Sequence, residues 1–250
     1  MNDRHWLSAL FSPTGGTAAI AKAITGGAGQ VVDLSVPAPD TPVPASAVML
    51  AAVPVFGGRI PAVALDRLAA LHGSGPAAAV VVYGNRAYED ALLELCDALT
   101  GAGFQVIAAA AFVAQHSIVP AIAAGRPDES DLEAAARFGQ AVLDKLAQPV
   151  PPTLVTPPGN LPYKDWKGVP FHPAAGESCI ACGLCASRCP VGAIPPGQPG
   201  HTDPERCITC MRCVSLCPRK ARAIPAPAFQ ATAAMLSEKA AAPRQPEWFL

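Results

Sequence analysis

The sequence has few aromatic residues, almost no net charge and no long hydrophobic run. Aromatic residues make up 6% of the 250 residues. Hydrophobic residues make up 51%, but much of that share is alanine. The longest apolar run spans residues 106–114, whereas a membrane-spanning helix needs about eighteen or more apolar residues. A formal net charge of −1 does not point to nucleic acid. We therefore expect neither a membrane span nor a nucleic-acid partner.

The N-terminus also lacks the pattern of a secretory signal. Its apolar stretch, residues 6–10, follows Asp3 and Arg4 and is too short for the apolar core of a signal peptide. Thiols that stay free to bind metal are typical of a reducing compartment, and eight cysteines of this chain form a metal-binding pattern. We therefore expect a cytoplasmic protein.

Eight of the nine cysteines form two copies of the pattern C-I-x-C-x-x-C-x-S-x-C-P, which begin 28 residues apart. The first copy comprises Cys179, Cys182, Cys185 and Cys189, and the second comprises Cys207, Cys210, Cys213 and Cys217. This spacing is typical of four-iron cubes in two-cluster ferredoxins, where the fourth cysteine of each copy binds the other cube. Structural zinc is the alternative, but zinc sites use two separated cysteine pairs and need no third cysteine or C-P ending.

This rule gives a ligand set for each cube. Cluster I takes Cys179, Cys182, Cys185 and Cys217, and cluster II takes Cys207, Cys210, Cys213 and Cys189. Because the fourth ligands cross, we expect the module to fold only with metal. Met211 stands where the first copy has Gly183, so we expect it to shield cluster II, and we expect four isoleucines to cover the cubes (Ile180, Ile194, Ile208 and Ile224). Cys96 lies on the apolar face of an expected helix and is interpreted as a buried, inert thiol.

Residues 1–148 alternate short apolar runs with helical patterns, which predicts an α/β fold. We expect strands at residues 5–11, 30–36, 48–55, 77–83 and 104–113, and helices at residues 17–24, 62–71, 90–100 and 129–146. The sheet is expected to be doubly wound, with five parallel strands in the order 2-1-3-4-5. Between the second and third strands lies a proline-rich segment, residues 37–46, so we expect an irregular connection there instead of a helix.

The rest of the chain divides by composition. We expect residues 149–176 to form a proline-rich linker that wraps around the first domain, and residues 177–224 to form an α+β domain with two [4Fe-4S] clusters. The tail, residues 225–250, is expected to carry a short helix near residues 232–239 and to end in a mobile segment.

A loop between the first strand and the first helix has the composition of an anion site. It comprises Ser12, Thr14, Gly15, Gly16 and Thr17. Glycines let the backbone approach an anion, which the amides and the positive helix end then bind. The loop lacks both a Walker lysine and the pattern G-x-G-x-x-G, which disfavours a nucleoside triphosphate or a dinucleotide. A helix cap without ligand is the alternative.

The chain resembles a family of flavodoxin–ferredoxin fusions, in which a flavodoxin-like half precedes a two-cluster ferredoxin half. The matching stretches, which cover nearly all of residues 10–222, are S-P-T-G-G-T, P-V-F-G-G-R-I-P, Y-G-N-R-A-Y-E-D-A-L, P-G-N-L-P-Y-K and both cysteine copies. The resemblance implies a flavodoxin-like sheet whose first loop binds the phosphate of FMN. It also implies that two further loops frame the flavin ring, through Phe56, Gly57, Gly58, Arg59, Gly84, Asn85, Arg86 and Tyr88.

The sequence departs from true flavodoxins at the ring. Those proteins surround the flavin with acidic side chains, whereas here Arg59 and Arg86 stand in the loops; solvated surface arginines are the alternative interpretation. His116 and Ser117, which follow the fifth strand, either line the pocket or cap their own loop.

We expect an iron–sulfur flavoprotein that transfers electrons between two [4Fe-4S] clusters and FMN. Residues 177–224 carry six basic and three acidic side chains, a net charge of +3, which favours an acidic redox partner protein. Three alternatives stay open: a ferredoxin-dependent reductase of a small molecule, a redox sensor without turnover, and a zinc-stabilised scaffold. No catalytic base or nucleophile stands out in the sequence.

Overall fold

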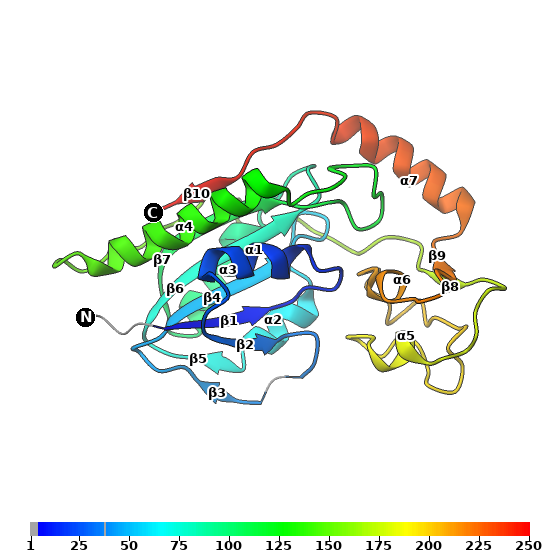
Figure 1. Cartoon of the computed structure of the whole chain (residues 1–250), viewed down its shortest axis with the longest axis horizontal. Helices are drawn as coiled ribbons and strands as arrows, with labels where there is room; N and C mark the ends of the chain where they lie inside the picture. The colour runs from blue at the N-terminus through cyan, green and yellow to red at the C-terminus, as the bar shows by residue number, and fades with distance from the viewer. Residues whose placement is uncertain (1–4, 38) are drawn as a thin grey trace.

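A computed structural model of the chain describes residues 5–37 and 39–250. The main sheet has the strand order β10-β7-β6-β4-β1-β2, and all neighbouring strands except β10 and β7 are parallel (Figure 1). The strands are β1 (Trp6–Leu10), β2 (Gln30–Asp33), β4 (Val48–Pro54), β6 (Pro76–Tyr83), β7 (Gln105–Val113) and β10 (Glu247–Phe249).

The sheet has one strand more than the five that the sequence predicts. The C-terminal tail returns along the sheet, and β10 pairs antiparallel with residues 109–111 of β7. The expectation of a mobile end is therefore wrong. The tail helix, α7 (Ala226–Lys239), is also longer than expected. The sequence gives little sign of β10, because a three-residue edge strand is too short to show a period-two pattern.

Two pairs of helices cover the two faces of the sheet. On one face lie α1 (Gly16–Thr25) and α4 (Glu129–Ala147), and on the other lie α2 (Ala62–Leu68) and α3 (Ala91–Gly101). Buried side chains of β4 alternate between the faces, so that Met49 packs towards α2 and α3 whereas Leu50 packs towards α1 and α4. A parallel strand that is covered on both faces reads as a continuous apolar run, as β4 does.

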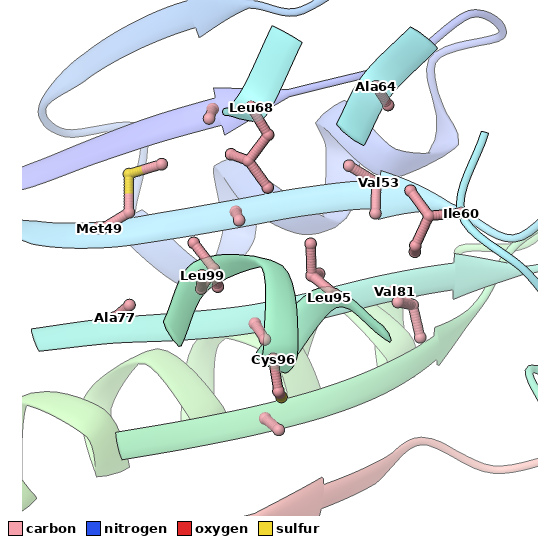
Figure 2. Close-up of a cluster of buried hydrophobic side chains, with 14 of the residues drawn as sticks. Met49, Val53, Ile60, Ala64, Leu68, Ala77, Val81, Leu95, Cys96 and Leu99 are labelled. Carbon is pink, nitrogen blue, oxygen red and sulfur yellow. The ribbon is translucent and has the colours of Figure 1, made fainter. Parts of the chain in front are cut away.

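Cys96 lies within the core between α3 and the sheet. Figure 2 shows it beside Leu95 and Leu99, close to β6, the strand that carries Ala77 and Val81. Burial raises the pKa of the Cys96 thiol to about 12, so the group stays protonated. The thiol therefore packs as a small apolar side chain, in agreement with the interpretation from the sequence.

The connection between β2 and β4 contains no helix in its described residues, 34–37 and 39–47. It carries the short strand β3 (Thr41–Pro42), which pairs in parallel with β5 (Leu71–His72) just after α2. In place of a crossover helix, this segment thus has a two-residue strand, which forms a separate two-stranded sheet with β5.

A second body, which we call the cysteine module, spans residues 174–223 and lies beyond the carboxyl ends of the parallel strands (Figure 1). It contains the antiparallel pair β8 (Ala174–Ala175) and β9 (Arg222–Ala223) and the short helices α5 (Leu184–Ser187) and α6 (Arg212–Ser215). None of the helices within the described residues is both long and apolar enough to cross a membrane.

The segment between α4 and the cysteine module is held against the sheet. Val155 donates its N–H to the Val106 carbonyl of β7 at 3.0 Å. The buried Asp90 carboxylate accepts hydrogen bonds from the backbone N–H groups of Asn160 and Lys164, at 2.8 and 2.7 Å. These bonds lower the pKa of Asp90, although burial opposes them.

Candidate functional site

The carboxyl ends of the parallel strands face three adjoining cavities. The largest, of about 460 Å³, lies beside the turn between β1 and α1; a second, of about 60 Å³, borders the ends of β4 and β6. The third, of about 270 Å³, lies between the loop after β4, the segment around Trp166 and α7. His116 and Ser117 line all three. Open parallel sheets bind ligands at this end, and small-molecule pockets typically enclose about 300–1,000 Å³.

The turn after β1 has the geometry of an anion site. Helix α1 begins at Gly16, and Gly15 before it is left-handed, with φ of 99°. The Ser12 hydroxyl accepts the Ala18 N–H at 2.9 Å, which fixes the turn. Thr14, Gly15 and Gly16 line the largest cavity, and Thr17 lines the second. Amides of the first helical turn and the positive end of the helix dipole favour a bound anion here.

The second cysteine copy closes these cavities from the opposite side. Met211, Val214 and Ser215 line the largest cavity, Cys210 lines the second, and Ile208 and Thr209 line the third. The cysteine module therefore contacts the sheet at the edge where a ligand would bind. Arg212 also bridges the two bodies, because its guanidinium donates to the Ser35 hydroxyl at 2.6 Å.

The eight cysteines of the module line two further cavities of about 20 Å³ each. Cavity I is lined by Cys179, Cys182, Cys185 and Cys217, and cavity II by Cys189, Cys207, Cys210 and Cys213. Each set takes three cysteines from one copy and the fourth from the other, as the ligand assignment requires. Among residues 5–37 and 39–250, no three His, Cys, Asp or Glu side chains converge on a single ion. A cube does not need such convergence, because each of its cysteines binds a different iron.

Both copies curl through the same backbone turns. The residue two places after the first cysteine is left-handed in each copy, with φ of 53° at Ala181 and 50° at Thr209. The residue four places after it is also left-handed, with φ of 74° at Gly183 and 63° at Met211. Met211 therefore adopts a strained conformation, and its buried side chain lies between cavity II and the largest cavity.

Backbone amides point at the sulfur atoms. Ala193 donates its N–H to Cys189 Sγ at 3.2 Å, and Ala221 donates its N–H to Cys217 Sγ at 3.2 Å. Burial opposes ionisation of Cys217, but the amides of Ala221 and its neighbours lower its pKa overall. Burial raises the pKa of the Cys210 thiol to about 12. Such a thiol ionises at neutral pH only when a metal takes the place of its proton, so this donor set fits iron ligation.

The isoleucines of the module differ from the expectation in two places. Ile194 and Ile208 line cavity II, as expected, and Ile180 lines cavity I but is 61% exposed. Ile224 lines neither cavity; the buried side chain that lines cavity I beside it is Arg222.

Eight of the expected flavin contacts line the cavities at the mouth of the sheet. They are Thr14, Gly15, Gly16, Thr17, Phe56, Gly57, Gly84 and Arg86. Gly57 and Gly84 are required for packing as well, because a Cβ atom at Gly57 would clash with the Trp166 ring and one at Gly84 would clash with His116.

Four residues that were expected to contact the flavin bind other parts of the protein instead. The expectation is most clearly wrong for Arg59. Its guanidinium donates to both carboxylate oxygens of Glu94 at 2.6 and 2.9 Å and to the Lys164 carbonyl at 2.6 Å. Glu94 is buried in α3 and needs a cation, which Arg59 supplies. Gly58 packs directly against Glu89, whose carboxylate pairs with Arg86. Neither Arg59 nor Gly58 lines a cavity at the mouth.

Asn85 and Tyr88 bind the C-terminal tail in place of a ligand. The Asn85 amide donates to the carbonyls of Ala240 and Ala242 at 2.8 and 3.0 Å, and its oxygen accepts the Arg244 N–H at 2.9 Å. The Tyr88 hydroxyl donates to Glu247 at 2.9 Å. The sequence cannot reveal these contacts, since they join positions more than 150 residues apart.

His116 both caps its loop and lines the cavities. Its Nδ1 accepts the N–H groups of Ile118 and Val119 at 3.2 and 3.1 Å. Burial, reinforced by the nearby Arg86, lowers the pKa of His116 to about 4. The ring is therefore neutral at pH 7.

Arg126 was not predicted as a site residue. It lines the largest cavity opposite the β1–α1 turn and pairs with Asp131. The feature of the sequence that could have indicated this role is the position of Arg126 after β7, at the carboxyl end of the sheet.

Comparisons with known proteins cover the two halves separately. Residues 178–221 match the family of 4Fe-4S dicluster domains, which supports an iron–sulfur, electron-transfer role for this module. No curated protein matches the chain. The structural match with a solved flavodoxin from the domain Archaea covers 57% of this chain and 98% of the flavodoxin chain, with 16% sequence identity and a TM-score of 0.39.

Proposed function

We propose that this chain is an iron–sulfur flavoprotein that transfers electrons between two [4Fe-4S] clusters and FMN. The proposal rests on the position of Cys210, which lines both cavity II and the cavity at the ends of β4 and β6. A cluster in cavity II and a flavin at the mouth of the sheet would therefore be direct neighbours. Bound FMN supplies a group that takes up one or two electrons, whereas the clusters carry one at a time.

The residues at the mouth fit FMN in two parts. The turn that contains Thr14, Gly15 and Gly16 would hold the phosphate through backbone N–H groups at the start of α1. Phe56 lines both the second and the third cavity and would lie beside the ring, with Gly57 and Trp166 of the third cavity at the edge of the ring. His116, neutral and lining all three cavities, would separate the phosphate from the ring without adding charge.

Anaerobic purification of the full chain tests this proposal directly. We expect about eight iron and eight sulfide per chain and one extractable FMN, together with overlapping cluster and flavin absorbance. Iron without flavin would limit the protein to an iron–sulfur carrier. A colourless protein that contains zinc would refute the proposal.

The third cavity favours a second candidate, a reductase that passes electrons from the flavin to a small molecule. Its wall is largely apolar, with Phe56, Trp166, Ile208 and Leu236, and Lys239 lies at its rim. Steady-state turnover of quinones or nitro compounds with reduced ferredoxin would support this activity. Electron transfer to proteins alone would leave the chain as a carrier.

An acidic redox protein is the proposed partner. Four of the six basic side chains of residues 177–224 are exposed, namely Arg188, Arg206, Arg219 and Lys220. Arg212 and Arg222 point inward and do not contribute to this surface. Transfer to an acidic carrier is expected to slow as salt rises, because exposed charges are screened over about 8 Å at physiological ionic strength. Rates that do not change with salt would refute this partner.

A further inference from the structure

The two cysteine copies differ in charge at one buried position. Ala193 and Ala221 are equivalent, because each donates its N–H to the fourth cysteine of its own copy. The next residue is Ile194 in the first copy and Arg222 in the second. Both are 3% exposed. Ile194 lines cavity II and Arg222 lines cavity I, so at this position an apolar side chain in one copy is replaced by a guanidinium in the other. Arg212 also lines cavity II, but its guanidinium donates to the Ser35 hydroxyl of the sheet unit.

The Arg222 guanidinium contacts neutral oxygens and thiols, Cys185 of cavity I and Cys213 of cavity II, although it lines cavity I alone of the two. It donates to the carbonyls of Pro199 and Pro173 at 2.6 and 3.0 Å and to the Thr202 hydroxyl. Its Nη1 lies 3.8 Å from Cys185 Sγ, and its buried Nε has no hydrogen-bond partner. In the part of the chain that the structure describes, no carboxylate pairs with Arg222. A buried charge without an opposite charge is costly, so this site is incomplete without an anion.

A [4Fe-4S] cluster supplies that anion. With four thiolates the oxidised cluster carries a net charge of about −2, and it gains one further negative charge when it accepts an electron. A fixed positive charge in contact with the cluster stabilises the reduced state more than the oxidised state. We propose that Arg222 is the counter-charge of the cluster in cavity I, and that it raises the reduction potential of this cluster more than that of the cluster in cavity II.

The inference rests on the proposed function, since it requires two clusters. It assigns a role to the sequence difference between the copies. At this position the cluster nearer the solvent receives the buried Arg222, whereas the cluster at the sheet is covered by Ile194 and has only the half-buried Arg212, which is bound to Ser35. The reaction involved is the gain of one electron from an external donor, with no bond formed or broken. Arg222 therefore acts through its charge and not as a proton donor.

A redox titration of the anaerobic full chain, followed by electron paramagnetic resonance, tests this role. Arg222→Ile, which copies the residue of the other half, is expected to lower one of the two cluster potentials more than the other. The equilibrium constant for reducing that cluster should fall at least tenfold, which is about 59 mV for one electron. Arg222→Lys should keep most of the wild-type potential. Arg188→Ile removes an exposed charge from the same module and should change little, because water screens it.

The outcomes separate the inference from the proposed function. Wild-type protein without iron contradicts the proposed function itself. Intact clusters whose potentials shift no more in Arg222→Ile than in Arg188→Ile overturn only the role of Arg222. If Arg222→Ile loses one cluster, iron analysis of Arg222→Lys and Arg222→Met decides. Retention with lysine and loss with methionine supports the counter-charge, whereas loss in both overturns it.

Discussion

The sheet unit, residues 6–147, and the cysteine module are stabilised by different means. The sheet unit buries one apolar cluster on each face of its sheet, with large side chains such as Phe11, Phe112 and Phe138 fully enclosed. The module has two two-residue strands and two four-residue helices. A body this small rarely supplies enough core by itself. We therefore expect that the part proposed to carry electrons is also the part that needs its metal in order to fold.

A similar contrast separates the two cysteine copies. Cys182 and Ile180 of the first copy are exposed, whereas Cys210 and Met211 of the second copy are buried against the sheet. An external donor would therefore reach cavity I first, and a flavin at the mouth would exchange electrons with cavity II. With the proposed cofactors, cavity I would lie on the solvent side of the chain and cavity II on the flavin side.

Removal of iron is expected to have the largest effect of the changes described here, because it should destabilise the cysteine module and not the sheet unit. An anaerobic chelator should unfold the cysteine module and leave the sheet unit folded, because only the module depends on thiolate ligands. Hydrogen exchange would show loss of protection around β8 and β9, with β4 and β6 still protected. A module that stays protected without iron would contradict this account.

His116 gives the sheet unit a pH dependence of its own. Its pKa falls from 6.5 to about 4 on folding, so between these values the unfolded chain binds more protons than the folded chain. Stability contributed by the neutral ring is complete above about pH 6.5 and is lost as the pH falls towards 4, by up to about 3 kcal/mol.

His116→Asn tests this effect, since the asparagine oxygen can accept the same backbone N–H groups without titrating. We expect the variant to show a smaller loss of strand protection between pH 7 and pH 4.5 than the wild type. Identical losses in the two proteins would exclude His116 as the cause.

Asn85→Ala is expected to release the tail from the sheet unit. The variant loses three hydrogen bonds between the loop after β6 and residues 240–244, which corresponds to roughly 1–3 kcal/mol. Trypsin should then cleave after Arg244 about 5- to 100-fold faster. Tyr88→Phe is the matched control; it loses only the bond to Glu247 and should show a smaller increase. Unchanged cleavage in Asn85→Ala would show that other contacts hold the tail.

Replacing Met211 with glycine, the residue at the equivalent position of the first cysteine copy, should have the smallest effect on stability of the changes described here. Met211→Gly relieves a left-handed backbone, worth about 1 kcal/mol, and loses a buried side chain, worth about 2 kcal/mol. The net change should stay within about 1 kcal/mol. Removal of the side chain opens cavity II towards the largest cavity, so we expect faster bleaching of one cluster in air. Gly183→Ala, at the equivalent position, is the control; equal rates in both variants would deny Met211 a shielding role.

The sequence predicts the main elements of the fold because each carries a local signal. The parallel strands β4 and β6 are continuous apolar runs, and the crossed cysteine sets follow from one repeated spacing. The three-residue strand β10 and the two-residue strand β3 carry no such signal. The sequence could not reveal the partners of Arg59 and Asn85 either, since these contacts join distant segments whose proximity exists only in the folded chain.

Flash photoreduction of the anaerobic full chain tests the central claim most directly. With a one-electron donor in limiting amount, cluster absorbance should bleach first and then recover as the flavin is reduced. The account predicts that this second phase has a rate independent of protein concentration, because Cys210 places cavity II beside the cavity at the mouth of the sheet. A rate that rises in proportion to protein concentration, or a flavin that is never reduced by the clusters, would contradict it.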